Sequence, residues 1–480
     1  MFRSNLALKV VLVFSILTSA VSQADVVNQR PNILLVVADD LGWTDLGSYG
    51  GEIDTPNLDG LAEQGVKFND FHVSVSCSPT RSMLMSGNDN HVAGLGNMAE
   101  LLADNQIGKP GYEGHLNDRV ASLAEVMREA GYHTYLSGKW HLGHKKGSLP
   151  FDRGFEHSFS MLFGGASHWA DMHGILPMDD PAKYTRDGKF LESLPGDFYS
   201  SRSYADFLME AIRENRGDGK PFLAYLSFTA VHDPVQVPEP WLSKYRGKYD
   251  DGYEALKATR WKAAKKVGVV PRSAELAERH PMIKPWNKLS AEERAVEARG
   301  MEVYAGMLDA MDYHYGRVVD FLKDIGEYDN TVIIFVSDNG ANPWYSDEYP
   351  GADTSEFRDQ FDYSLENIGN PRSNHAYGIG FASGSGGPLD KYKFTVGEGG
   401  IRTYILGQFK AVHTGHIPVQ QGDIKSIATS GDLTLEDSHS LAAIGGKCII
   451  NAPGFKLVVQ NLLIGEVVID NECFIPVQGL

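Results

Sequence analysis

The sequence has few cysteines, no excess of positive charge and no long apolar run. Only three cysteines occur in 480 residues, which excludes a disulfide-rich scaffold; Cys448 and Cys473 are the two that an oxidising compartment could join. The 44 lysines and arginines are outnumbered by 62 acidic residues. Nucleic acid, which requires a basic face, is therefore excluded as a partner. Any anion that the protein binds must meet positive charge that is gathered locally.

The N-terminal residues are typical of a secretory signal. Arg3 and Lys9 flank a short polar start, an apolar run at residues 10–20 follows, and residues 22–24 offer small side chains at the cleavage positions. The run is too short to span a bilayer. We therefore expect residues 1–24 to be removed, the mature protein to be periplasmic or secreted, and no part of the mature form to lie in a membrane.

Two apolar stretches end in acidic residues. Residues 33–37 have the pattern of a strand buried on both faces of a parallel sheet, and Asp39 and Asp40 follow them. A second such strand at residues 331–337 ends in Asp338 and Asn339. Taken separately, the first pair also suits a helix cap and the second a turn. Because open α/β sheets bind ligands at this edge, the two strand ends together predict an oxygen site for Ca²⁺ or Mg²⁺.

The segment around Cys77 carries the strongest chemical signal. Cys77 is followed by Pro79, a residue favoured in the first turn of a helix, and by Arg81. A helix that begins near Pro79 places Cys77 at its positive end, where an anion is held and Arg81 points towards the same ligand. Without further partners, the same residues suit a small buried cysteine beside a surface arginine.

Basic and imidazole side chains follow other expected strands. An amphipathic helix is predicted at residues 116–131, then a strand, and then Lys139 and His141, which project to one face of an extended segment. His232 follows a further strand at residues 222–229. Several strand ends that bring Asp, Lys and His to one edge favour a catalytic role for these groups over a structural one.

Two further stretches are less specific. Residues 241–311 are strongly charged and helical in character, which predicts an insertion plus the helix that leads back to the sheet; the charges suit a solvated face or a lid over the substrate. Residues 378–387 are rich in glycine and serine and are expected to form a loop. Lys391 and Lys393 follow, shortly before the Glu-Gly-Gly that begins at Glu398.

Six of these landmarks occur in one order, and they make residues 31–402 resemble a bacterial arylsulfatase of the formylglycine-dependent sulfatase family. The landmarks are the Asp-Asp strand end, Cys-x-Pro-x-Arg, Gly-Lys-Trp-His, a strand-end histidine, Asp-Asn-Gly, and a lysine five residues before Glu-Gly-Gly. The resemblance implies an alkaline-phosphatase-like α/β/α sandwich with a mostly parallel central sheet. It also implies hydrolysis of aryl or carbohydrate sulfate esters.

The resemblance also assigns roles to individual residues. Cys77 becomes the precursor of formylglycine (3-oxoalanine), which a maturation enzyme produces, and Ca²⁺ is the family's usual ion, with Mg²⁺ as the alternative. The implied metal ligands are Asp39, Asp40, the modified Cys77, Asp338 and Asn339. The implied catalytic and sulfate-binding residues are Cys77, Arg81, Lys139, His141, His232 and Lys393, the last preferred to Lys391 by its distance from Glu398.

The implied reaction uses both hydroxyls of the hydrated aldehyde. One hydroxyl attacks sulfur while His232 gives a proton to the leaving alcohol. His141 then takes the proton of the second hydroxyl, so that sulfate is eliminated and the aldehyde returns.

The C-terminal part departs from the family pattern. After Glu-Gly-Gly-x-Arg the family usually continues with Val-Pro and a small subdomain, whereas Thr403 opens a stretch without that match, with short β-like runs between Gly, Pro and Asn. We therefore divide the chain into residues 1–24, a catalytic domain at 25–402 that contains the charged insertion, and an atypical segment at 403–480. Two other functions stay open: a phosphodiester or phosphonate monoester hydrolase of the same superfamily, and an inactive anion-binding homologue.

Overall fold

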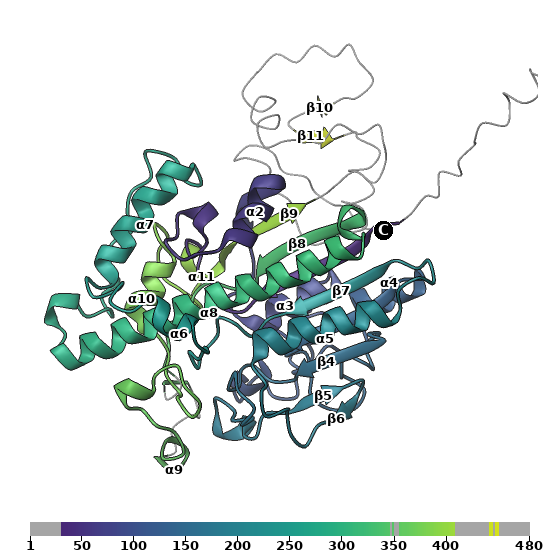
Figure 1. The fold of residues 1–480 in the computed structure, drawn as a ribbon, viewed down its shortest axis with the longest axis horizontal. Coiled ribbons are helices and arrows are strands. Elements are labelled where there is room, and N and C mark those ends of the chain that lie inside the picture. Colours follow the sequence, from purple (N-terminus) through teal and green to yellow (C-terminus); the bar gives the residue numbers. More distant parts are fainter. Residues whose placement is uncertain (1–29, 346–347, 350–354, 409–440, 445–446, 451–480) are drawn as a thin grey trace, which may run out of the picture.

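The computed structural model describes residues 30–345, 348–349, 355–408, 441–444 and 447–450. Nine strands among these residues form one mixed sheet, in the order β2-β9-β8-β1-β7-β3-β4-β5-β6 (Figure 1). No helix in this described part of the chain is both long and apolar enough to cross a membrane. The predicted signal at residues 1–24 and the side chains of Cys448 and Cys473, which an oxidising compartment could join, lie outside the described residues.

The centre of the sheet is parallel, as the apolar runs predicted. Helices cover both faces of these strands, which suits continuous runs of Val, Ile and Leu. The parallel strands are β8 (Thr331–Ser337), β1 (Asn32–Ala38), β7 (Phe222–Ser227), β3 (His133–Lys139) and β4 (His157–Met161). The antiparallel strands are β9 (Arg402–Gln408) and β2 (Val66–His72) beside β8, β5 (Tyr184–Arg186) and β6 (Lys189–Phe190) beyond β4, and a separate pair, β10 (Leu441–Ile444) and β11 (Lys447–Ile450).

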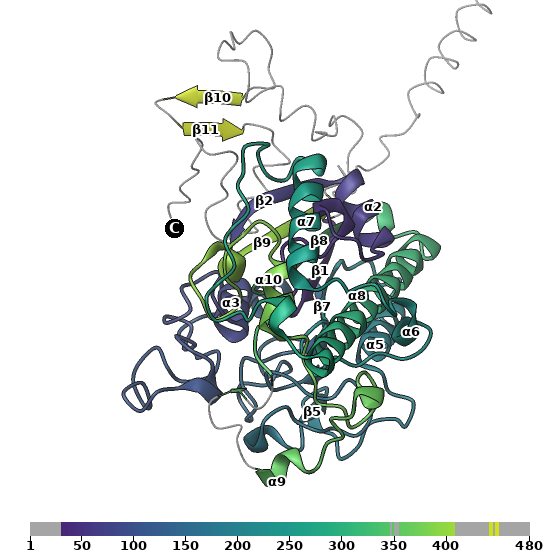
Figure 2. The ribbon, with the colours of Figure 1, turned by 90° about the vertical axis from the view of Figure 1, so that its left-hand side faces the viewer.

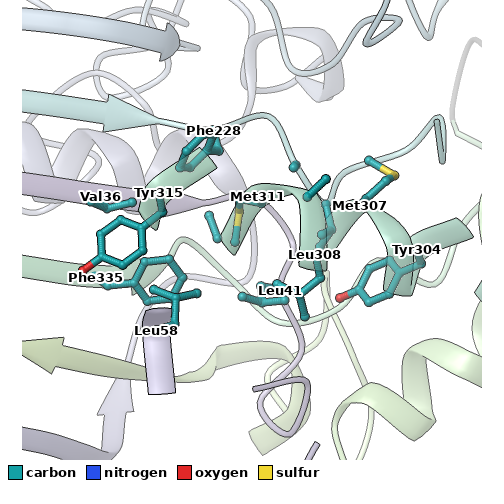
Figure 3. Packing of buried hydrophobic residues seen from close by; sticks show 14 of the residues in the cluster. Val36, Leu41, Leu58, Phe228, Tyr304, Met307, Leu308, Met311, Tyr315 and Phe335 are labelled. Atoms are coloured by element: carbon teal, nitrogen blue, oxygen red, sulfur yellow. The ribbon is translucent and has the colours of Figure 1, made fainter. Parts of the chain in front are cut away.

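Helices lie on both sides of the sheet, which gives the predicted α/β/α arrangement. One face is covered by α2 (Pro56–Gln64), α5 (Ser200–Glu214) and α8 (Ala291–Asp324), the other by α3 (Cys77–Ser86) and α4 (Leu123–Glu129). Figure 2 shows α8 and α3 on opposite sides of the sheet. Val36 and Phe335 of the sheet belong to one buried cluster with Leu308, Met311 and Tyr315 of α8 (Figure 3). The other α-helices of the described residues are α6 (Trp241–Lys244), α7 (Tyr253–Val267), α9 (Ser355–Arg358), α10 (Gly378–Ser385) and α11 (Glu398–Ile401).

The face that carries α3 and α4 is covered less completely by the described residues. An apolar groove of about 800 Å³ lies over it. Its lining includes Ile33, Leu35, Leu84, Val126, Ile334 and Ile405. The groove also extends from Arg30, just before β1, to Asp338, just after β8. Its walls are therefore mainly those of a sheet face and two helices, and it reaches the polar site described below at Asp338.

The helix predicted at residues 116–131 is shorter than expected. It begins only after Ser122, whose hydroxyl and backbone form a capping box with the first turn. Residues 116–121 stay outside the helix. The guanidinium of Arg153 donates to the carbonyl oxygens of Leu116 and Val120, at 2.5 and 2.7 Å. Those carbonyls are therefore committed to a residue distant in the sequence.

The prediction of a loop at residues 378–387 is wrong, because most of this stretch forms α10. Gly380 lies against Tyr253 of α7, where an added Cβ would come within 2.3 Å of the ring. The small residues thus allow two helices to approach closely rather than breaking the chain into a loop.

The charged stretch at residues 241–311 contains α6, α7 and most of α8, as the helical pattern predicted. Its charges are not simply a solvated face, however, because Arg299 and Glu302 are buried and paired at 2.9 Å. The boundary predicted after residue 402 also needs correction. Because β9 lies between β8 and β2 and buries Tyr404, the catalytic fold extends to Gln408.

Candidate active site

The carboxyl ends of four neighbouring strands bring most of the predicted site residues to one edge. The strands β8, β1, β7 and β3 are adjacent and parallel, so the residues that follow them share that edge. Asp39 and Asp40 follow β1, Asp338 and Asn339 follow β8, Lys139 ends β3, and His232 lies in the turn after β7. Asp40 has a φ of +63°, a strained conformation of the kind that functional sites tolerate.

Cys77 reaches the same point from a helix. It is the first residue of α3, it is buried, and its Sγ lies 3.5 Å from Asp39 Oδ1 and 3.7 Å from Asp40 Oδ1. Burial raises the pKa of the Cys77 thiol, although Lys139 and Lys393 act to lower it. The thiolate is the reactive form of cysteine. An unmodified Cys77 is therefore a poor nucleophile at neutral pH, despite its position at a helix N-terminus.

Three buried cations are paired with the three carboxylates of the edge. The pairs are Lys139 with Asp39 (2.6 Å), Lys393 with Asp40 (2.9 Å) and Arg81 with Asp338 (2.7 Å). Their side chains are at most 1% exposed. Burial works to raise the pKa of Asp39, but Lys139, His232 and Arg81 lower it below its ordinary value. Lys393, rather than the alternative Lys391, is the lysine that reaches the cluster.

The donor atoms of this cluster fit a hard divalent cation. Ligand atoms of Asp39, Asp40, Cys77 and His232 lie within 4.8 Å of one another. Asn339 donates its Nδ2 to Asp40 Oδ1 at 2.6 Å, and its Oδ1 is buried without a hydrogen-bond partner in the described part of the chain. An orphaned buried acceptor is costly, and a bound cation would satisfy it. Carboxylate and amide oxygens are the ligands that Ca²⁺ and Mg²⁺ prefer.

His232 is placed to carry a proton. Its Nε2 lies 3.4 Å from Asp40 Oδ2 and 3.4 Å from Lys393 Nζ, and its Nδ1 donates to the backbone oxygen of Asp233 at 2.7 Å. Burial opposes protonation of the ring, but the carboxylates of Asp40 and Asp233 outweigh it and raise the pKa of His232 well above its ordinary value. The imidazole is therefore protonated at neutral pH and suits a general acid.

Lys139 and His141 do not contact the same group, although the sequence predicted one shared face. Lys139 binds Asp39, whereas His141 Nε2 lies 2.9 Å from Glu100 Oε1. Trp140 turns away, and its indole donates to the carbonyl oxygen of Ser148 at 2.9 Å.

Sequence reasoning missed two residues that contact this site. Glu100 lies in a short turn at Ala99–Leu101, outside any strand end, so no pattern marked it. Ser227 accepts a hydrogen bond from Arg81 Nη1 at 2.6 Å. Its position as the last residue of β7, beside β1, is the signal that could have indicated it.

This edge holds three acids, three cations, a histidine with a raised pKa and a buried cysteine at a helix N-terminus, an arrangement that suits a hydrolase of anionic esters. Comparison with known proteins specifies the family. The family model described as Sulfatase matches residues 31–400, and the chain belongs to the sulfatase family. It is a sulfuric ester hydrolase of the alkaline-phosphatase-like fold, in a family that depends on formylglycine and a divalent metal.

Individual relatives agree with this placement. An uncharacterized sulfatase of Schizosaccharomyces pombe is 45% identical over 389 residues, 78% of this chain and 69% of the relative. An arylsulfatase of Klebsiella aerogenes is 41% identical over 377 residues, 78% of this chain and 80% of the relative. The crystal structure of Ps i-CgsB in complex with k-i-k-neocarrahexaose has a TM-score of 0.52 at 23% identity and covers 82% of this chain and 68% of its own. That likeness concerns the fold alone.

Proposed function

We propose that this chain hydrolyses aryl or carbohydrate sulfate esters with a nucleophile derived from formylglycine at position 77 and with Ca²⁺ as the resident ion. The observation that carries the proposal is the position of Cys77: buried at the N-terminus of α3, with its Sγ within 3.5 and 3.7 Å of two carboxylates. Burial raises the pKa of this thiol and so makes it a weak nucleophile, whereas an oxidised side chain would place an oxygen atom among the proposed metal ligands.

The residues divide into those that hold the metal and those that meet the sulfate. Asp39, Asp40, Asp338 and Asn339 would hold the cation. When bound, the cation and the hydrated aldehyde supply an activated hydroxyl nucleophile at neutral pH. Arg81, Lys139 and Lys393 now neutralise the carboxylates. With a divalent cation on those carboxylates, the three cations serve to stabilise the negative charge on the sulfate oxygens.

Two histidines account for proton movement. His232, whose pKa is raised, donates a proton to the oxygen of the leaving alcohol. His141 is the complementary base: burial lowers its pKa, although Glu100 acts to raise it, so its ring is neutral and can accept a proton. The opposite pKa shifts of the two histidines are the basis for assigning one as acid and the other as base.

Ca²⁺ is preferred to Mg²⁺ for two reasons. The donors are rich in carboxylates, and they come from two strand ends and a helix rather than from a regular octahedral cage. Ca²⁺ accepts such irregular geometry with little bound water, whereas Mg²⁺ usually retains several waters. Elemental analysis of the purified protein, followed by chelation and re-addition of each ion, tests the choice. Full activity in a metal-free preparation would contradict the metal assignment altogether.

The substrate class rests on the relatives. The Klebsiella aerogenes relative is an arylsulfatase, and the Ps i-CgsB structure contains a neocarrahexaose. We therefore propose aryl and carbohydrate sulfates as the two classes to compare. One preparation should be assayed with an aryl sulfate, a panel of sulfated glycans and an aryl phosphodiester, with Cys77→Ala as the inactive control. Faster turnover of the phosphodiester would replace the proposal with the phosphodiesterase alternative.

Modification of Cys77 has its own measurement. Mass spectrometry of the peptide that contains Cys77 and Arg81 should show formylglycine after co-expression with a formylglycine-generating enzyme, which we propose as the maturation partner. An unmodified Cys77 in an inactive protein would favour the anion-binding alternative. We also propose export to the periplasm or beyond, on the basis of residues 1–24, and cell fractionation tests it.

A further inference from the structure

Glu100 and His141 form a buried pair beside the proposed reaction centre. Glu100 Oε1 lies 2.9 Å from His141 Nε2, and the two side chains are 14% and 7% exposed. Gly164 lies against both groups: a Cβ at this position would come within 3.0 Å of Glu100 Oε1 and of His141 Cε1. The packing therefore leaves the pair little freedom to separate.

The charge states of Glu100 and His141 determine which ring nitrogen of His141 carries the proton. Burial works to raise the pKa of Glu100, but His141 lowers it to about 2, so the carboxylate is ionised and can only accept a hydrogen bond. The proton of the neutral imidazole must therefore lie on Nε2, the nitrogen that faces Glu100. The other nitrogen, Nδ1, is buried and has no hydrogen-bond partner among the described residues. An unpaired buried acceptor at a proposed base needs an explanation, and a reacting proton provides it.

The charges around the pair support the same state. Burial, with smaller contributions from Lys139 and Arg81, lowers the pKa of His141, which keeps the ring neutral. Beyond Glu100, burial together with the Glu100 charge raises the pKa of Asp179 to about 7, and Lys183 acts to lower it. Burial also lowers the pKa of His144, which Lys183 and Lys145 lower further and Glu100 acts to raise. Glu100 is thus the anion that faces the ring of His141.

We propose that Glu100 is a positioning residue that holds His141 in the tautomer with its proton on Nε2, so that Nδ1 is the atom that accepts a proton during sulfate release. The role in sulfate release rests on the proposed function, whereas the tautomer does not. The logic is that of a serine protease, in which a buried aspartate sets the tautomer of the catalytic histidine. A purely structural Glu–His bond would stabilise the loop around Glu100 without affecting the proton transfer at Nδ1 or its pH dependence.

The tautomer can be measured directly in the whole protein. Nitrogen NMR of ¹⁵N-histidine-labelled wild type should show an unprotonated Nδ1 and a protonated Nε2 for His141, whether or not Cys77 is modified. Glu100→Gln offers both an amide donor and an acceptor, so it should give a mixture of tautomers, whereas Glu100→Asp should retain the wild-type form. Glu113→Gln, which removes a carboxylate paired with Arg119 on the same stretch of chain, is the control and should change nothing at His141.

Kinetics with an aryl sulfate give a second readout. General bases contribute roughly 10²- to 10⁴-fold, so loss of the correct tautomer in Glu100→Gln should lower kcat by roughly 10- to 100-fold, with little change in KM and partial rescue in Glu100→Asp. Because the Glu100 charge acts to raise the pKa of His141, the acidic limb of the kcat profile should move to lower pH in Glu100→Gln.

The two proposals fail differently. A wild-type spectrum with the proton on Nδ1, or a Glu100→Gln protein with wild-type tautomer and kcat, overturns the role of Glu100 even if the enzyme is an active sulfatase. An inactive wild type with the proton on Nε2 overturns the proposed function and leaves the assignment of Glu100 as the residue that sets the tautomer intact.

Discussion

Lys139 and Asp39 form an ion pair that is wholly buried, with 2.6 Å between Nζ and Oδ2 and no exposed surface on either side chain. The pair joins the end of β3 to the end of β1 across the intervening β7. A lysine this close to a proposed metal ligand competes with the metal for the same carboxylate. The pair therefore links the charge state of the metal site to the residues that are proposed to hold sulfate.

Lys139→Met should separate metal binding from catalysis. Without the competing ammonium, Asp39 should bind Ca²⁺ more tightly, so that added Ca²⁺ raises the melting temperature more than in wild type. In the metal-free protein the same change should destabilise the fold by about 3 kcal/mol, because it leaves a buried carboxylate without its main partner. Turnover of aryl sulfate should fall by at least about 100-fold, since one stabilising charge on the sulfate is lost.

Calorimetric titration with Ca²⁺ and thermal unfolding measure these effects. Lys257→Met is the matched control, because Lys257 is also buried but binds Ser383 and the carbonyl oxygen of Leu389. It should leave the affinity for Ca²⁺ unchanged. Weaker Ca²⁺ binding by Lys139→Met would contradict the competition that we infer.

The pH dependence of stability should include a contribution from Glu297 on α8. Burial, together with Glu348 and Glu293, raises the pKa of Glu297 from 4.5 to about 7, although Tyr345 donates a hydrogen bond at 2.9 Å. Between these two pH values the folded chain binds more protons than the unfolded chain, so the free energy of unfolding falls as the pH rises. Glu297→Gln should therefore be more stable than wild type at pH 8, by about 1–3 kcal/mol, and equally stable near pH 4.

Denaturant unfolding at both pH values measures the difference. Glu292→Gln, on an exposed position of the same helix, is the control and should have little effect at either pH. An equal gain for Glu297→Gln at pH 4 and pH 8 would show that packing, rather than ionisation, is responsible.

Much of the fold and most of the site could be predicted because they depend on local sequence. The runs at β1 and β8 are continuous in Val, Ile and Leu, and the polar residues that end them must share an edge if the strands are parallel neighbours. The sequence could not predict which side chains pair with one another at that edge. Arg81 was expected to point at an anionic ligand, whereas in the described structure its guanidinium binds the carboxylate of Asp338 and the hydroxyl of Ser227.

The errors have a common physical cause, which is a contact between residues far apart in the sequence. The start of α4 depends on Arg153, and the helix at Gly378–Ser385 depends on the ring of Tyr253. Glu100 was not predicted as a site residue because its partner, His141, is 41 residues away in the sequence and no local pattern connects the two. Residue propensity and spacing carry no information about such contacts. Predictions based on them therefore place most helices and strands correctly but misplace some of their ends.

Truncation should locate the end of the catalytic fold. A chain that ends after Gln408 keeps β9 between β8 and β2, so we expect it to fold cooperatively and to bind Ca²⁺ as the full chain does. A chain that ends after Arg402 lacks the buried Tyr404 and Leu406, each of which contributes roughly 1.5–3 kcal/mol, and exposes the edge of β8. It should unfold or aggregate. Equal melting temperatures and Ca²⁺ affinities for the two truncations would place the boundary at residue 402 after all.

Cys77→Ser tests why position 77 needs more than one hydroxyl. Serine offers a single oxygen in the place of the thiol, near Asp39 and Asp40. That oxygen can form a bond to sulfur, while the bond from sulfur to the alcohol breaks and His232 gives the alcohol its proton. No second hydroxyl then remains for His141 to deprotonate, so sulfate cannot be eliminated. The variant should accumulate one sulfate ester per chain and turn over far more slowly than wild type.

Intact-mass analysis after exposure to an aryl sulfate measures the trapped ester, and peptide mapping should place it on the peptide that contains Arg81. Cys77→Ala is the matched control, because it removes the nucleophile and should show neither burst nor added mass. The decisive comparison is the steady state. If Cys77→Ser turned over at the wild-type rate, a single hydroxyl would suffice, and the proposed need for formylglycine at this position would have to be abandoned.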